Sequence, residues 1–203
     1  MGFDRDRTLS EADLAADPLD QYRTWLAEAT EAGLDEPQAA VIITSTPDGH
    51  PSGRHVLVRR TSATAFGVFT NEESRKAREM TANPHVALVV GWVPMGRQVL
   101  VTGVAEPMTD TESDEYFASR PRGSQIAAWA SKQSTVIPDR AFLEQRVAEE
   151  TERWEGRDVE RPPNWGGFWI TPEAVELWQG RESRLHDRLR YRRPGPDQSS
   201  GSD

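Results

Sequence analysis

The sequence predicts an α+β fold in which an antiparallel β-barrel is interrupted by a block of helices. Three observations lead to this prediction. Short β-rich runs follow one another with short connections between residues 39 and 104. Residues 109–154 instead have helical composition and helix-capping residues. Strand character returns between residues 167 and 191, so late strands could close a barrel that the helices had opened.

The helices and strands can be placed from the residues that typically begin and end them. Barrel strands are expected at 40–44, 54–59, 66–70, 86–90 and 98–104, and late strands at 167–171, 175–178 and 184–191. Ser74 can cap a helix that Asn83-Pro84 ends. Thr109 and Glu112 have the spacing of a capping box, and further helices are expected at 124–130 and 139–154.

The two ends of the chain are expected to lie outside the fold. Residues 1–16 are polar and acidic without periodicity, which predicts a mobile N-terminal arm. Residues 193–203 are rich in Pro, Gly and Ser, which predicts a disordered tail. Residues 17–192 should form a single domain that begins with a helix, because Asp17 can cap it and Pro18 suits its first position.

The composition limits the function classes. With 203 residues the chain can bury one sizeable core, and a net charge of −9 argues against nucleic-acid partners. Cysteine is absent and no histidine pair has ligand spacing, so we expect no metal site. No apolar run could span a bilayer, and the first residues lack a signal-peptide core. We expect a cytoplasmic protein with no membrane partner.

A cationic stretch near the C-terminus is the strongest candidate for a binding site. Arg184, His186 and Arg188 are two apart, so in a strand they would project from one face. Such a row of donors suits phosphate or another anion. Gln179-Gly180 allows a tight turn that would put Trp178 on the adjacent strand. A charged edge strand without a ligand is the alternative, and the pattern alone leaves it open.

Two further groups could bind anions. Ser74-Arg75-Lys76 opens a helix, where free backbone N–H groups favour an anion, and Arg54, Arg59 and Thr70 could join them. Ordinary surface charge is the competing interpretation.

In the helical block, Tyr116 and Arg120 are four apart on one helical face, and Ser124 follows a glycine. This group could converge on a second anion, although such pairs are commonly only surface contacts.

Residues 178–188, Trp-Gln-Gly-x-x-x-Arg-Leu-His-Asp-Arg, resemble the C-terminal signature of the pyridoxamine 5'-phosphate oxidase family. Other family motifs are matched by residues 54–59, 69–70, 74–76, 97–98, 116–125 and 133–134. The resemblance implies an FMN-binding split β-barrel with flanking helices. It also implies a homodimer with its sites at the interface. The implied reaction oxidises pyridoxamine or pyridoxine 5'-phosphate to pyridoxal 5'-phosphate, with O2 as electron acceptor and H2O2 as product.

The resemblance also implies residue roles. The implied FMN ligands are Arg54, Val56, Leu57, Arg59, Phe69, Thr70, Ser74, Arg75, Lys76, Gln98, Gln133, Ser134, Trp178 and Arg188. The implied substrate-binding residues are Arg59, Tyr116, Arg120, Ser124, Arg184, Leu185 and His186. Arg184 and His186 would be the catalytic residues.

The sequence departs from the family pattern in three places. Arg59 replaces the usual lysine, which keeps the charge but changes the donor geometry. An early substrate-covering segment has no counterpart in residues 1–7, and the end of the chain lacks the usual closing strand, so the resemblance covers roughly residues 17–191. Two alternatives therefore stay open: a sister FMN oxidase of a secondary-metabolite precursor, and a non-catalytic protein that binds FMN or pyridoxal phosphate. The preference between amine and alcohol substrates is not indicated.

Overall fold

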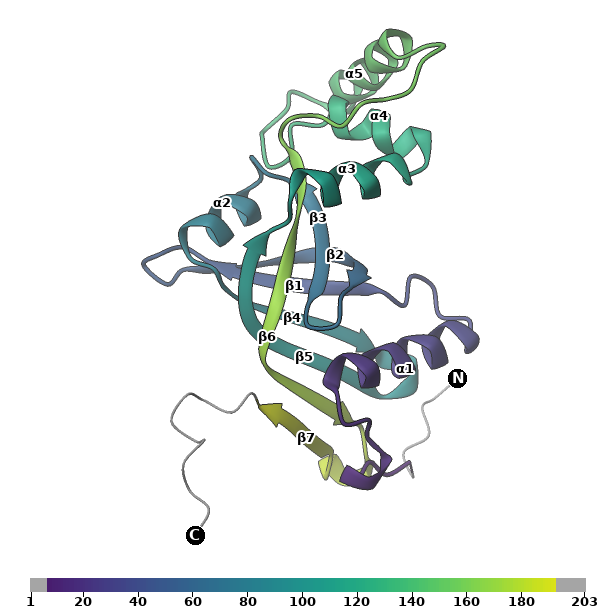
Figure 1. Cartoon of the computed structure of the whole chain (residues 1–203), viewed down its shortest axis with the longest axis vertical. Coiled ribbons are helices and arrows are strands. Elements are labelled where there is room, and N and C mark those ends of the chain that lie inside the picture. Colours follow the sequence, from purple (N-terminus) through teal and green to yellow (C-terminus); the bar gives the residue numbers. More distant parts are fainter. Residues whose placement is uncertain (1–6, 193–203) are drawn as a thin grey trace.

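The computed structural model describes residues 7–192, whose strands form one antiparallel sheet that closes into a barrel (Figure 1). The strand order is β3-β2-β1-β4-β5-β6-β7, and β3 also pairs with β6, so that six strands close on themselves and β7 extends the sheet beyond the barrel. The strands are β1 (Ala39–Ser45), β2 (Pro51–Thr61), β3 (Phe66–Asn71), β4 (His85–Trp92), β5 (Arg97–Pro107), β6 (Trp165–Gln179) and β7 (Asp187–Arg192). The predicted barrel, closed by a late strand, is confirmed.

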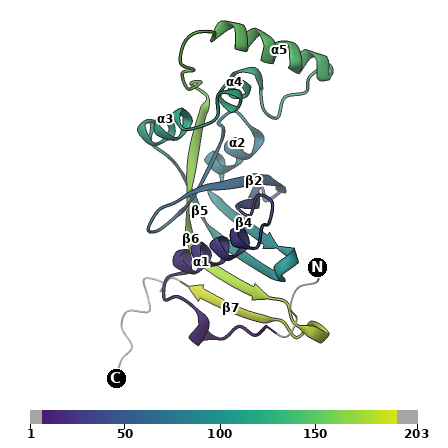
Figure 2. The same ribbon diagram turned by 90° about the vertical axis from the view of Figure 1, so that its right-hand side faces the viewer.

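The helices lie at the two ends of the barrel. They are α1 (Pro18–Glu31), α2 (Arg75–Ala82), α3 (Asp110–Ala118), α4 (Arg122–Ala130) and α5 (Arg140–Arg153). Figures 1 and 2 show α3, α4 and α5 at one end of the molecule and β7 at the opposite end. The predicted helix starts are confirmed by their caps: the side chains of Asp17, Ser74 and Asp139 accept backbone N–H groups, and Thr109 and Glu112 form a capping box.

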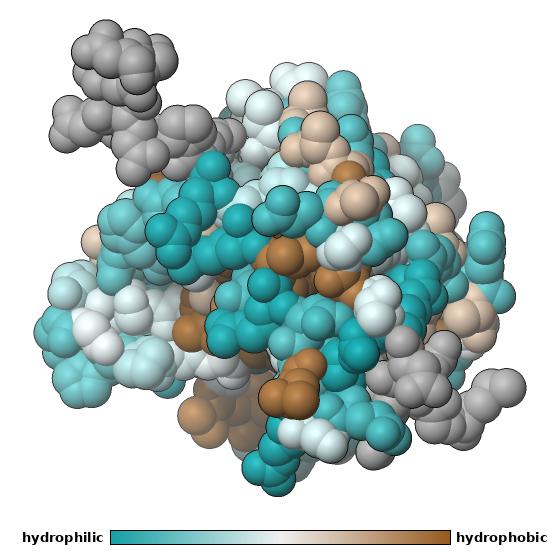
Figure 3. All heavy atoms as spheres, turned by 90° about the horizontal axis from the view of Figure 1, so that it is seen from below, coloured by the Kyte–Doolittle hydropathy of each residue, from teal (hydrophilic) through white to brown (hydrophobic). Residues whose placement is uncertain are grey.

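The described part of the N-terminal segment, residues 7–16, lies beside β7. It contains a short 3-10 helix, η1 (Glu11–Asp13), where the sequence predicted no element. The backbone N–H of Leu9 donates to Asp187 Oδ2 at 3.0 Å, and the Tyr191 hydroxyl donates to the Ala15 carbonyl at 2.6 Å. Seen from this end, hydrophilic side chains cover most of the surface and a few hydrophobic ones show between them (Figure 3). The rest of the predicted arm and the tail from residue 193 lie outside the described residues.

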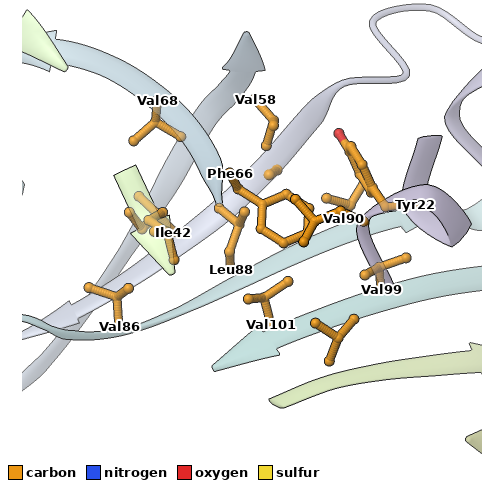
Figure 4. Close-up of a cluster of buried hydrophobic side chains, with 14 of the residues drawn as sticks. Tyr22, Ile42, Val58, Phe66, Val68, Val86, Leu88, Val90, Val99 and Val101 are labelled. Carbon is orange, nitrogen blue, oxygen red and sulfur yellow. The ribbon is translucent and has the colours of Figure 1, made fainter. Parts of the chain in front are cut away.

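The barrel interior holds the main hydrophobic core. Side chains from neighbouring strands, including Ile42, Phe66 and Leu88, point toward one another and are fully buried (Figure 4). Helix α1 packs on this core through Tyr22, whose ring meets Phe66 edge-on at 5.1 Å, and Trp25. Burying a side chain of this size stabilises the fold by about 1.5–3 kcal/mol. The barrel is therefore a rigid frame for the residues on its outer surface.

Two predictions about the late strands are wrong in detail. The expected strands at 167–171 and 175–178 form one continuous strand, β6, because Pro172 sits at a β-bulge: Gly103 pairs with Pro172 and Thr102 with Ala174, which leaves Glu173 without a partner. The expected strand at 184–191 begins only at Asp187, because residues 182–184 form a 3-10 turn, η3 (Glu182–Arg184).

Candidate active site

A groove between β2, β3, α3 and α4 brings together many of the predicted site residues. Its volume is about 570 Å3. The predicted residues among its lining are Leu57, Arg59, Phe69, Thr70, Tyr116, Arg120, Ser124 and Gln133. The described chain also forms two larger depressions along α5, of about 690 and 770 Å3; the first contains no predicted residue and the second only Gln133 and Ser134. We call the site with the predicted residues the α3–α4 groove.

Aromatic rings support a half-buried cation in this groove. Phe69 stacks on Tyr116 at 3.9 Å and on Trp165 at 5.4 Å between ring centroids. The Arg120 guanidinium carbon lies 4.7 Å from the centre of the Trp165 ring. Burial lowers the pKa of Arg120, and its Nη1 is buried without a hydrogen-bond partner in the described chain. A buried donor of a charged group that has no partner is costly, so the groove is suited to an anion that would pair with Arg120 Nη1.

A second cationic cluster lies beside the groove, around Lys76 at the start of α2. Its Nζ donates to Gln133 Oε1 at 2.7 Å, to Thr70 Oγ1 at 2.9 Å and to Ser74 Oγ at 3.3 Å. Burial and the nearby charge of Arg54 lower the pKa of Lys76 to about 8. The helix start, the hydroxyls and the amine thus meet as the sequence predicted.

Arg54 and Arg75 complete this cluster from β2 and α2. The backbone N–H of Arg75 donates to Ser134 Oγ at 3.1 Å. The Nε of Arg75 donates to Glu79 Oε1 at 2.7 Å, and Arg54 Nη2 lies 3.5 Å from Glu79 Oε2. Burial raises the pKa of Glu79, but hydrogen bonds from Ser52, Thr44 and Arg75 outweigh it and bring the pKa down to about 2. The carboxylate is therefore ionised at neutral pH.

Sequence reasoning missed two residues of this region. Glu79 lies four residues after Arg75, and that helical spacing could have indicated the pair. Trp165 forms the aromatic support below Arg120, but it begins a strand far from the other motifs and no local pattern marks it. Val56, a predicted FMN residue, packs against the barrel core and does not line the groove.

The remaining predicted residues gather at the opposite end of the molecule. Gln98, Trp178 and Arg188 are register partners across β5, β6 and β7, so their side chains project from the same face of the sheet. Arg188 forms a two-pronged ion pair with Glu176, at 3.0 and 2.9 Å. Trp178 and Arg188 lie on adjacent strands, as predicted, but not through a tight turn at Gln179-Gly180: Gln179 still pairs with Asp187, and residues 180–186 form the connection.

The geometry expected for the Arg-Leu-His segment is wrong, because it is a turn and not a strand. Ser183 and Arg184 have left-handed φ angles of 54° and 62°, and Arg184 and Leu185 are exposed. His186 is anchored: its Nδ1 accepts the backbone N–H of Arg181 at 3.0 Å, and its ring lies 4.6 Å from that of Trp178. In the neutral imidazole this bond leaves the proton on Nε2.

The predicted site residues of one described chain thus form two separate groups. We call the α3–α4 groove with the Lys76 cluster the first half-site, and Gln98 with residues 178–188 the second half-site. The lining of the α3–α4 groove includes none of the residues between Trp178 and Arg188, and Figures 1 and 2 show the groove helices and β7 at opposite ends. Within residues 7–192 no group of three or more His, Asp or Glu side chains could hold a metal ion. None of the helices in this range is long and apolar enough to cross a membrane.

The closed barrel, with α3, α4 and α5 inserted between β5 and β6, defines a split-barrel protein. The chain belongs to the pyridoxamine 5'-phosphate oxidase family. The family model described as pyridoxamine 5'-phosphate oxidase matches residues 26–154. The model described as the pyridoxine 5'-phosphate oxidase C-terminal dimerisation region matches residues 165–201, so the resemblance extends beyond the residue 191 expected from the motifs.

Individual relatives agree with this assignment. The chain is 52% identical over 188 residues to the pyridoxine/pyridoxamine 5'-phosphate oxidase of Rubrobacter xylanophilus, covering 93% of this chain and 87% of that protein. It is 51% identical over 187 residues to the enzyme of the same name from Acidothermus cellulolyticus, covering 91% of this chain and 83% of that protein. The crystal structure of PhzG from Burkholderia lata, in complex with tetrahydrophenazine-1-carboxylic acid, superposes with a TM-score of 0.88 at 32% identity over 95% of both chains.

Proposed function

We propose that this protein is an FMN-dependent oxidase that converts pyridoxamine or pyridoxine 5'-phosphate to pyridoxal 5'-phosphate, with O2 as electron acceptor and H2O2 as product. The observation that carries the proposal is the pair of adjacent anion sites, one around Lys76 and one around Arg120. A phosphorylated cofactor and a phosphorylated substrate held side by side require such a pair. The names of the relatives support the same reaction.

The residues of the first half-site fit the phosphate end of FMN. Lys76, Arg54 and Arg75 supply charge, and the start of α2 supplies backbone donors. The other proposed ligands in this half are Leu57, Arg59, Phe69, Thr70, Ser74, Gln133 and Ser134; Val56 adjoins them on β2 but packs against the barrel core. Gln98, Trp178 and Arg188 would approach the cofactor from the second half-site. When bound, FMN supplies the redox chemistry, so the protein contributes binding and orientation.

The substrate would be held at its two ends by different half-sites. Tyr116, Arg120 and Ser124, with Arg59, would bind its phosphate in the α3–α4 groove. Arg184, Leu185 and His186 would meet its ring, where Arg184 offers a cation and His186 a fixed N–H donor for developing charge.

Because these half-sites lie at opposite ends of one chain, we propose a two-fold homodimer with its sites at the interface. A two-fold axis would place the groove of each protomer against the 182–186 turn of its partner, twice. The match of residues 165–201 to a dimerisation region supports this arrangement.

The test is the absorbance spectrum of the FMN-loaded protein under anaerobic conditions. Adding pyridoxamine 5'-phosphate should bleach the flavin bands, and O2 should restore them with formation of H2O2. Protein that binds no FMN would contradict the cofactor assignment.

A sister oxidase is the second candidate, favoured by the similarity to PhzG. Bleaching by a tetrahydrophenazine carboxylic acid, but not by any B6 phosphate, would select it. FMN binding without bleaching by either compound would select the non-catalytic binding protein.

A further inference from the structure

Glu79 of α2 lies behind the proposed FMN phosphate site and forms ion pairs with two of its arginines. We propose that Glu79 is a positioning residue that holds Arg54 and Arg75 in the orientation that binds the cofactor phosphate. This inference rests on the proposed FMN site and concerns how that site is organised.

The burial pattern separates Glu79 from the residues that would touch a ligand. The Glu79 side chain is only 6% exposed, whereas those of Arg54 and Arg75 are 22% and 57% exposed. The carboxylate thus lies beneath two guanidinium groups that reach the surface. In the described chain it is the only carboxylate within ion-pair distance of either arginine.

Hydrogen bonds to Glu79 converge from three elements. Arg75 Nε on α2 donates to Oε1 at 2.7 Å, while Ser52 Oγ on β2 donates to Oε2 at 2.6 Å. The hydroxyl of Thr44 on β1 donates to the same Oε2. A buried charge with this many donors is satisfied without a ligand, so the network exists before any anion arrives.

The two hydroxyls connect Glu79 to Arg54 with a fixed polarity. Thr44 and Ser52 each give their single proton to the carboxylate, which leaves their lone pairs to accept from Arg54 Nη1 and Nη2. A glutamine at position 79 would bring an amide N–H2 into this network. That group would face either the two hydroxyls that orient Arg54 or the Nε of Arg75, which all donate to the carboxylate, so at least one of the two arginines would lose its defined orientation.

Removing the negative charge of Glu79 has two opposing effects on an anion at the site. The site becomes more positive, but the exposed parts of the guanidinium groups are screened by solvent, which limits this gain. The loss of two oriented, charge-assisted donors is the larger effect. The net result expected for Glu79→Gln is weaker binding of the phosphate alone.

The experiment compares FMN with riboflavin, which has the same ring and lacks the phosphate. Fluorescence titrations would use the full-length protein, Glu79→Gln, and Ser52→Ala, which removes one connecting hydroxyl. Glu144→Gln is the matched control, because Glu144 also pairs with an arginine four residues away, on the exposed surface of α5. Thermal unfolding of each apo-protein would report on its fold.

Glu79→Gln should lower FMN affinity roughly tenfold or more, with riboflavin affinity unchanged, and Ser52→Ala should give a smaller loss of the same kind. Glu144→Gln should change neither. A parallel loss of FMN and riboflavin affinity, or an unchanged ratio of the two, would overturn the positioning role. If the unmutated protein shows no preference for FMN over riboflavin, the proposed phosphate site is itself wrong and the inference falls with it.

Discussion

At the scale of single residues, Arg120 combines a cost to the free protein with a proposed role in substrate binding. Its buried Nη1 has no partner within residues 7–192, and its guanidinium stacks on Trp165. Arg120→Met should therefore leave the melting temperature of the apo-protein unchanged or raise it, because methionine keeps the packing and removes an uncompensated charge. The KM for pyridoxamine 5'-phosphate should rise ten- to a hundredfold, since a charge-assisted bond contributes about 1.5–3 kcal/mol. A lower melting temperature with an unchanged KM would show that Arg120 is structural.

Lys76 predicts a pH dependence of FMN affinity. Its pKa of about 8 means that the ammonium group is charged at pH 7 and loses its proton as the pH rises toward 9. Above pH 7 the FMN phosphate keeps its charge, so the attraction falls with Lys76 deprotonation and FMN affinity should decrease between pH 7 and 9. Lys76→Met should bind FMN more weakly and with little pH dependence, as fluorescence titrations at each pH would show. An equal slope in the variant would assign the effect to another group.

Residue-scale prediction from the sequence worked where a motif is local. Ser74 to Lys76 share a helix start, so spacing alone could place that set. Tyr116 and Arg120 both line the groove, but the predicted common helical face is wrong, because α3 ends at Ala118 and Arg120 follows its C-cap. Trp165 was missed because the residues that it contacts come from other elements. For Glu79 the spacing from Arg75 was available, but its other partners, Thr44 and Ser52, come from β1 and β2. Only the closed barrel brings β6 against β3 and places α2 over β1 and β2.

At the scale of elements, the close approach of β5 and β6 gives a stability prediction. A Cβ at Gly103 would collide with the Thr171 carbonyl at the bulge, whereas one at Gly91 on β4 would meet nothing within 4 Å. Gly103→Ala should destabilise the protein by about 1–3 kcal/mol through the forced backbone shift. Gly91→Ala is the matched control and should change the free energy of unfolding little, as measured by urea unfolding. Equal stability of the two variants would contradict the tight packing at the bulge.

The ends of an element could be predicted where a side chain caps a helix. They could not be predicted where pairing with another strand determines how far a strand extends. Asp17 and Thr109 mark helix starts through bonds to residues within the next turn. Pro172 reads locally as a strand break, and only the bulge against Gly103 lets β6 continue through it. Arg184 and His186 alternate like strand residues, yet the chain must reverse direction there to pair β7 with β6.

At the scale of the whole molecule, the barrel fixes a separation that no side-chain movement could remove. Its six strands close between the α3–α4 groove and the 182–186 turn, with a core of fully buried side chains between them. The 182–186 turn is held at its base by Asp187. Its Oδ2 accepts from Arg181 Nη1 and from the backbone N–H of Leu9 in the N-terminal segment. A single protomer therefore presents each half-site as a rigid surface.

This separation makes intersubunit complementation possible. In the proposed dimer, Arg120→Met damages the groove half of every site and Arg184→Ala damages the turn half, so each pure variant should be nearly inactive when assayed far below the KM. When the two variants are mixed and allowed to exchange subunits, each mixed dimer would have one doubly damaged site and one intact site. Random pairing should then restore about one quarter of the unmutated activity. A mixture as inactive as its parents would mean that each site takes both halves from the same chain.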